Sequence, residues 1–96
     1  MVSSRIEGKV VAITADGNLV TTITSQQLKN APRDERVRVC CDEHETNGIF
    51  SSDHSEPDST FLAMLNGEGT LELAIVGLSA SEMLGIRVGE SVVVEW

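Results

Sequence analysis

Aromatic residues are scarce in this 96-residue chain, which has two Phe, one Trp and no Tyr. Its core must therefore be aliphatic, and Val, Ile and Leu do dominate the periodic segments. The chain also lacks any apolar run near the roughly 20 residues that a membrane-spanning helix needs. Because no apolar signal region follows Met1–Arg5, we expect a cytoplasmic protein without a membrane role.

Positive charge is also in short supply, since seven Lys and Arg residues oppose 15 Asp and Glu residues and give a net charge of −8. The arginines that come close together, Arg33, Arg36 and Arg38, are interrupted by Asp34 and Glu35. An acidic surface repels phosphate backbones, so we expect no nucleic-acid partner.

The chain has only two cysteines, and Cys40 and Cys41 are adjacent. Neighbouring Cα atoms lie about 3.8 Å apart across a trans peptide bond. An unstrained disulfide requires roughly 4.4–6.8 Å. We therefore expect two free thiols, in agreement with a reducing compartment.

Short alternating segments separated by turn residues make up the chain, which we treat as a single domain over residues 1–96. Residues 36–40 alternate strictly, so Val37, Val39 and Cys41 should share a buried face. Six or seven short strands of this kind indicate a small antiparallel barrel or sandwich. The clearest strands are expected at residues 6–14, 19–24, 36–40, 61–65, 71–76 and 91–96.

Helical signals are few. The sequence Ser79–Glu82 fits a capping box that opens a short helix before the last strand, and Leu84–Gly85 would end it. Ser25 could cap a single helical turn over residues 26–29. Residues 51–59 are polar, acidic and contain a proline, and we expect them to form a mobile loop.

Side chains that could bind a metal or take part in catalysis are concentrated at residues 40–58, where both cysteines, both histidines and several acids occur. Cys40 and Cys41 would point to opposite faces of a strand, and no zinc-type spacing is present. We therefore predict a solvated acidic loop with no metal site and no catalytic group. Met64, Met83 and Trp96 fall at apolar positions, so we expect the methionines in the core and Trp96 closing the barrel.

Two segments resemble one known domain. The sequence DGNLVTTI at residues 16–23 follows GKVV at residues 8–11, and NGEGTLELAIVGLSAS at residues 66–81 precedes LGIRVG at residues 84–89. Together they resemble the C-terminal β-barrel of the S-adenosylmethionine hydroxide adenosyltransferase and fluorinase family. The resemblance covers roughly residues 8–94 and implies an all-β antiparallel barrel with one short capped helix before the last strand.

The resemblance also implies a binding site. In that family the nucleoside of S-adenosylmethionine lies between this barrel and the N-terminal domain of a neighbouring subunit. Asn18 matches an Asn that contacts the adenine, and Gly77 falls in the backbone segment directly after a strand, which also contacts the adenine in that family. The implied ligand-binding positions are Asn18, Gly67, Glu68, Gly77 and Phe50.

Departures from the family pattern fall mostly at ligand positions. Asp16 replaces an apolar Phe, Thr22 and Val76 each replace an Asn, and Gly67 replaces a Ser that holds the methionine carboxylate. Glu68 adds negative charge beside that carboxylate position, which disfavours an anionic group. The resemblance does not include the family's catalytic N-terminal domain, so we expect that this chain alone is no enzyme and needs no cofactor.

Two functions stay open at this point. One is a non-catalytic barrel that works by association, as a homo-oligomer or docked on a separate protein partner. The other is a module that binds adenosine or S-adenosylmethionine and completes the active site of a separately encoded catalytic domain. A hydrolase or transferase acting alone has no support in the sequence.

Overall fold

The computed structural model describes residues 4–96, which form a curled sheet of eight strands with one short helix. The first three residues, on which part of the signal-sequence prediction rests, lie outside the described residues. The elements are β1 (Arg5–Ile13), β2 (Leu19–Thr24), β3 (Arg38–Cys41), β4 (His44–Asn47), β5 (Ile49–Ser51), β6 (Phe61–Leu65), β7 (Thr70–Ile75), α1 (Ala80–Leu84) and β8 (Ser91–Glu95).

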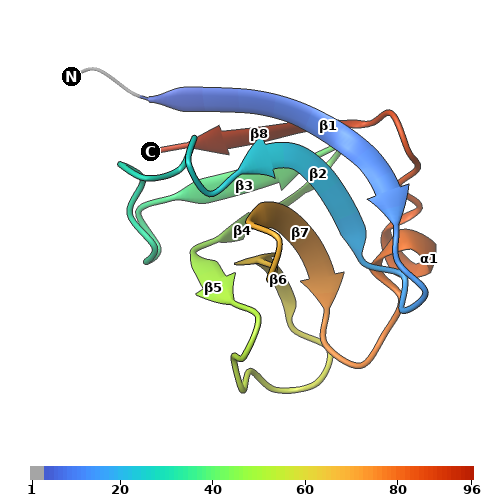
Figure 1. Ribbon diagram of the computed structural model, residues 1–96. Helices are drawn as coiled ribbons and strands as arrows, with labels where there is room; N and C mark the ends of the chain where they lie inside the picture. Colours follow the sequence, from blue (N-terminus) through green and yellow to red (C-terminus); the bar gives the residue numbers. More distant parts are fainter. Residues whose placement is uncertain (1–3) are drawn as a thin grey trace.

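The strand order β4-β3-β8-β1-β2-β7-β6-β5 bends into a nearly closed barrel (Figure 1). All pairings are antiparallel except that of β5 with β6. The hydroxyl of Thr46 on β4 donates to the carbonyl of Phe61 on β6 at 3.0 Å, which links the two ends of the curl. The predicted all-β barrel with a short helix before its last strand is confirmed.

The expected six or seven strands were too few, because β4 and β5 were not predicted. β4 is the polar sequence HETN with half of its positions exposed, so it carries no apolar alternation. It pairs with β3 through a tight turn in which Asp42 has a φ of 56°. β5 is only three residues long, and such a segment is too short to show a period.

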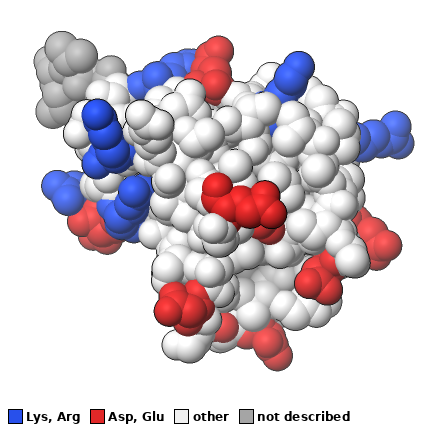
Figure 2. Space-filling view, in the orientation of Figure 1, with Lys and Arg blue, Asp and Glu red and all other residues white. Residues whose placement is uncertain are grey.

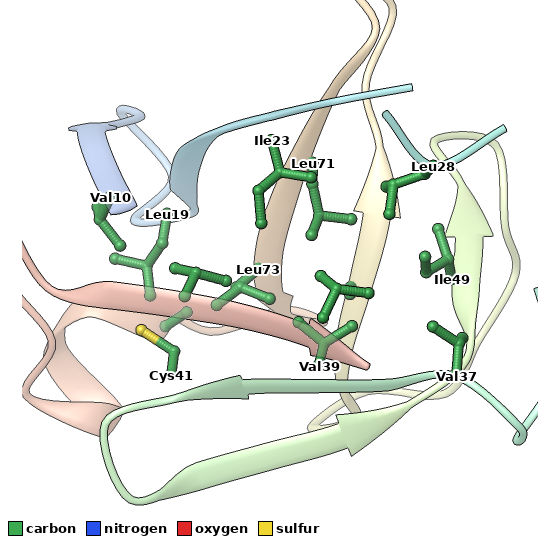
Figure 3. Close-up of a cluster of buried hydrophobic side chains, with 14 of the residues drawn as sticks. Val10, Leu19, Ile23, Leu28, Val37, Val39, Cys41, Ile49, Leu71 and Leu73 are labelled. Carbon is green, nitrogen blue, oxygen red and sulfur yellow. The ribbon is translucent and has the colours of Figure 1, made fainter. Parts of the chain in front are cut away.

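Aliphatic side chains from the inner faces of the strands, together with Leu28 and Val37 from the connection between β2 and β3, fill the barrel (Figure 3). Val37, Val39 and Cys41 point inward as predicted, and Trp96 packs partly buried against the same cluster. Met83 was wrongly assigned to the core: its side chain is 61% exposed on α1. Because a five-residue helix rests on the barrel by one face only, an apolar residue on its other face stays in solvent.

A second, smaller buried layer lies on the outer face of β6 and β7. Leu62 is 0% and its strand partner Ala74 5% exposed, although neither belongs to the central cluster. The chain after β5 rejoins the sheet at Val76, where Ser59 N donates to Val76 O at 2.8 Å and Val76 N to Thr60 O at 3.0 Å, and His54 of this loop lines a hollow together with Met64 and Ala74 of the outer face. We attribute the cover of Leu62 to residues 52–60.

The predicted loop at residues 51–59 needs one boundary correction, because Ser51 belongs to β5 and the loop begins after it. The pairing of Ser51 with Leu65 extends the strand by that residue. The expected mobility of the loop stays a prediction.

The N-cap at Ser79 and the helix stop at Gly85 are confirmed, whereas the return bond from the Glu82 side chain stays a prediction. Ser79 is the N-cap, with its hydroxyl accepting from Glu82 N at 3.2 Å, and Gly85 ends the helix with a φ of 68°. The predicted cap at Ser25 is wrong, because residues 25–30 form turns rather than a helix. Thr24 takes the role instead: its N–H donates to Gln27 Oε1 at 2.9 Å, and its hydroxyl accepts from Gln27 N at 3.3 Å.

Replacing Ser79 with alanine should lower the free energy of unfolding by about 0.5–2 kcal/mol, because the first turn of α1 loses its side-chain acceptor. Urea denaturation followed by circular dichroism measures the change. Ser55→Ala, at an exposed loop position, is the control and should stay within about 0.5 kcal/mol of the parent. Equal stability of both variants would show that the cap contributes nothing in solution.

No helix among residues 4–96 is long and apolar enough to cross a membrane.

Candidate functional site

One groove of about 390 Å³ opens where β7 runs into the loop before α1. It combines the turn between β1 and β2, the outer face of β6 and β7, and the loop that follows β5. Its lining consists of Asp16, Asn18, His54, Met64, Ala74, Ile75, Val76, Gly77, Leu78 and Ser79. Residues far apart in the sequence thus meet at one end of the barrel.

The turn between β1 and β2 is held rigidly at the edge of the groove. Thr14 N donates to Asn18 O at 2.9 Å, Asn18 N donates to the Thr14 hydroxyl at 3.0 Å, and Gly17 N donates to Thr14 O at 2.9 Å. Ser81 N in α1 donates to Gly17 O at 2.9 Å, so the turn is also fixed to the helix. These bonds set where Asn18 presents its side chain.

Gly17 is required at this contact. Its φ of 87° lies in the left-handed region, and a Cβ there would overlap the Ser79 side chain and lie 2.7 Å from Ser79 Cα. The glycine therefore permits the close approach of the turn to the helix cap. Two walls of the groove meet at this point.

A buried carboxylate lies behind Asn18. Glu72 on β7 is 7% exposed, and it accepts from Asn18 Nδ2 at 3.4 Å and from Asn66 Nδ2 at 2.6 Å. The Asn66 side-chain oxygen in turn accepts from Glu68 N at 2.9 Å and Thr70 N at 3.0 Å. Sequence reasoning missed this network, although an acid inside the apolar segment Leu71–Ile75 was a signal for it.

Of the predicted binding positions, Asn18 and Gly77 meet in the groove, as expected. Gly77 has a φ of 78° and lies beside the carboxylate of Asp58. The family departures Asp16 and Val76 lie in the same groove.

Gly67 and Glu68 lie on the exposed turn between β6 and β7, outside the groove lining. They connect with Asn18 only through Asn66 and Glu72. Thr22 likewise lies outside it, on β2, where its hydroxyl accepts from Lys9 N at 3.2 Å.

Phe50, another of the implied binding positions, does not line the groove. Phe50 lies on β5 and lines a separate hollow of about 240 Å³. The reason is the parallel pairing of β5 with β6, which places Phe50 beside Met64 but farther from β7. Its ring meets that of His54, which lines the groove, edge-on with ring centroids 6.1 Å apart.

Neither thiol is poised for nucleophilic chemistry. Burial, the Glu45 carboxylate hydrogen-bonded to the thiol, and the nearby Glu95 raise the pKa of Cys40. Burial, with the charges of Glu90 and Asp42, raises the pKa of Cys41 to about 11. Both cysteines are free and protonated at neutral pH. Within residues 4–96, no group of three or more His, Cys, Asp or Glu side chains is placed to hold a metal ion.

Apolar side chains are exposed around the same end of the barrel. The backbone bonds Ser81 N to Gly17 O and Gly89 N to Val10 O, at 2.9 and 2.8 Å, place the segment that contains α1 beside the β1–β2 hairpin. We call the exposed apolar residues on these two segments the rim: Val11, Ile13, Leu78, Met83 and Val88. The same two segments also carry the exposed acids Asp16, Glu82 and Glu90, and in Figure 2 Asp and Glu are spread over the face while Lys and Arg lie toward its upper part and sides.

Solved structures share this fold. An uncharacterized conserved protein from Thermotoga maritima is 22% identical with a TM-score of 0.76, over 94% of this chain and 35% of that one. A conserved hypothetical protein from Thermus thermophilus is 24% identical with a TM-score of 0.67, over 90% of this chain and 31% of that one. The domain thus spans about a third of each relative, 35% and 31%, and is part of larger proteins there. No curated protein matches the sequence.

The sequence itself matches a family model over residues 8–93, which is most of the chain. That model describes the SAM hydroxide adenosyltransferase C-terminal domain, so the match agrees with the motifs at residues 16–23 and 66–81. The chain therefore belongs to the SAM hydroxide adenosyltransferase C-terminal domain family.

Proposed function

We propose that this domain is a non-catalytic module that works by association, and that its groove holds an adenine nucleoside at the junction with the associated domain. The observation that carries the proposal is the convergence of Asn18, Val76 and Gly77, from separate parts of the chain, on one groove. A volume of about 390 Å³ is within the usual range for small-molecule sites.

The polar groups of the groove suit a purine. A side-chain amide can pair with the amine and ring nitrogen of adenine at once, as asparagine does when it reads that base. Asn18 offers such an amide, and Gly77, which has no side chain, lets a planar ring approach the backbone. Ala74, Met64 and Leu78 supply apolar contact for the ring faces.

The charge of the groove favours a neutral or cationic ligand. Asp16 lines it, and Asp58 lies beside Gly77. Phosphate groups would meet these carboxylates unfavourably, whereas the sulfonium of S-adenosylmethionine would not. Adenosine and S-adenosylmethionine are therefore better candidates than adenine nucleotides.

Association is supported by the rim and by the relatives. Leu78 belongs both to the groove lining and to the rim, so a domain docked on the rim would cover the ligand. Burial of exposed apolar side chains would drive that docking. In larger relatives the corresponding third of the chain is joined to other parts, which is consistent with a second copy or a separate partner acting here.

Catalysis by this domain alone has little support in the described residues. The groove contains acids and His54, but no thiol, and both thiols of the chain are protonated. A reaction at the bound ligand would need groups that the associated domain supplies. The domain contributes binding and orientation, which are themselves large parts of catalysis.

Backbone amide NMR during titration with adenosine and with S-adenosylmethionine tests the proposal. We expect saturable shifts centred on Asn18 and Gly77, and weak ones at Gly67, which lies outside the groove. Asn18→Ala should bind about tenfold more weakly, because one hydrogen-bonded contact of about 1.4 kcal/mol is lost. Asn30→Ala, in a hollow beside Trp96, is the matched control and should bind as the parent does.

Flat spectra at millimolar ligand would reject nucleoside binding. Sedimentation of the same samples tests the association half separately, since a homo-oligomer should appear in the sedimentation coefficient. A partner-dependent module would remain monomeric alone and form a complex only with the added second domain.

A further inference from the structure

Glu72 can only accept a hydrogen bond from the Asn18 side chain, and this sets how the Asn18 amide is turned. An ionised carboxylate accepts hydrogen bonds and donates none, so the amide group that faces it must be the NH₂. Asn18 Nδ2 lies 3.4 Å from Glu72 Oε1, and Glu72 itself does not line the groove. The Asn18 carbonyl oxygen and one N–H are therefore left for other partners.

We propose that Glu72 is a positioning residue that fixes the Asn18 amide and so makes the groove select 6-aminopurine over 6-oxopurine nucleosides. The inference rests on the proposed function, because it assigns a specificity to the same groove. It concerns a residue that touches no ligand and acts through its neighbour.

Glu72 is itself held from the other side. Asn66 donates to Glu72 Oε2 at 2.6 Å and to the Thr70 hydroxyl at 2.7 Å. The Asn66 side-chain oxygen accepts hydrogen bonds from Glu68 N and Thr70 N. These two bonds fix the orientation of the Asn66 amide. Glu72 also pairs with Val20 in the β2–β7 ladder, so its backbone is fixed by the sheet. If Glu72 turned away from Asn18, this buried carboxylate and the Asn18 amide would each lose a hydrogen bond.

The selectivity follows from the pattern of donors and acceptors. An Asn18 oxygen directed to the ligand accepts from the exocyclic amine of adenosine. The corresponding atom of inosine is a carbonyl oxygen, so two acceptors would face each other. A mismatch of this kind costs about 1–3 kcal/mol in amide–base pairs, which is about 5- to 150-fold in affinity.

Glu72→Gln is the test, because it keeps the side chain's shape while adding a donor. The amide introduced by this substitution can donate to the Asn18 oxygen, so the Asn18 amide can turn over and present its NH₂ to the groove. We expect the ratio of inosine to adenosine dissociation constants to fall from about 5- to 150-fold in the parent to within about threefold of one. Glu72→Asp keeps an acceptor-only group and should restore at least part of the preference.

Glu43→Gln is the matched control. It makes the same change of charge on the exposed β3–β4 turn, outside the groove lining, and should leave the ratio unchanged. If the parent binds adenosine and Glu72→Gln keeps the parental ratio, the inference is overturned while the proposed function stands. If the parent binds neither nucleoside, the proposed nucleoside binding and this selectivity are both rejected, and sedimentation decides the association half.

A ligand-free measurement on the parent covers the case in which Glu72→Gln fails to fold. One of the two Asn18 side-chain amide protons should be shifted downfield and protected from solvent exchange by the carboxylate. Two equivalent, rapidly exchanging protons would overturn the orientation, whatever the variants do.

Discussion

Replacing Gly17 with alanine should destabilise the domain by about 2–5 kcal/mol. A left-handed φ in a residue with a side chain costs about 1–2 kcal/mol, and Gly17 has a φ of 87°. The added Cβ would also lie 2.7 Å from Ser79 Cα, and overpacking of this kind costs about 1–3 kcal/mol. Small domains are stable by about 5–15 kcal/mol, so this loss is a large share of the total.

Gly89→Ala separates the two contributions. Gly89 has a φ of 101°, but a Cβ there meets no atom within 4 Å, so only the backbone strain applies. Urea denaturation of both variants should show Gly17→Ala as the less stable by about 1–3 kcal/mol. Equal losses would mean that the turn and the helix cap are not in contact in solution.

The same substitution should also disturb the groove. Gly17 stands between Asp16 and Asn18, and Ser79 belongs to the opposite wall. To relieve the overlap, the turn and the helix must separate, which shifts Asn18 from its position in the groove. At a temperature where Gly17→Ala remains folded, its adenosine affinity should therefore fall as well, whereas that of Gly89→Ala should not.

Most of the strands and the helix could be predicted from local sequence patterns. Residues 19–24 and 61–65 form strands with the predicted bounds, because their apolar alternation and flanking turn residues agree. The cap at Ser79 and the stop at Gly85 were also readable, since both depend on neighbouring residues alone. β4 and β5 were not readable, because their pairing partners, not their own sequences, make them strands.

The site was predictable only in part, for a related reason. Asn18 and Gly77 came from motif resemblance, and the fold brings them together. The place of His54 in the groove, and the absence of Phe50 from its lining, depend on how the chain after β5 returns to β7, which no local pattern encodes. Glu72 could have been suspected as a polar residue in an apolar strand, but its partners Asn18 and Asn66 are tertiary contacts.

Leu62→Ala should lower the free energy of unfolding by about 2–5 kcal/mol, as expected for a buried leucine. Leu62 is fully buried, yet it lies on the outer face of the barrel, away from the central cluster. The exposed Leu78 is the control, and Leu78→Ala should stay within about 0.5 kcal/mol of the parent. Denaturant unfolding of the three proteins measures both effects.

The measured loss of stability in Leu62→Ala shows whether the loop stays packed on the barrel, and therefore whether one wall of the groove is preformed. Residues 52–60 can cover Leu62 only if they stay packed on β6 and β7, and the same packing places His54 in the groove. A cost below about 1 kcal/mol would mean that the loop leaves this face open most of the time. Ligand binding would then have to order the loop, and saturating adenosine should raise the cost of Leu62→Ala toward that of a core leucine. A full cost without ligand would instead mean that the groove is preformed and that the predicted mobility of the loop is wrong.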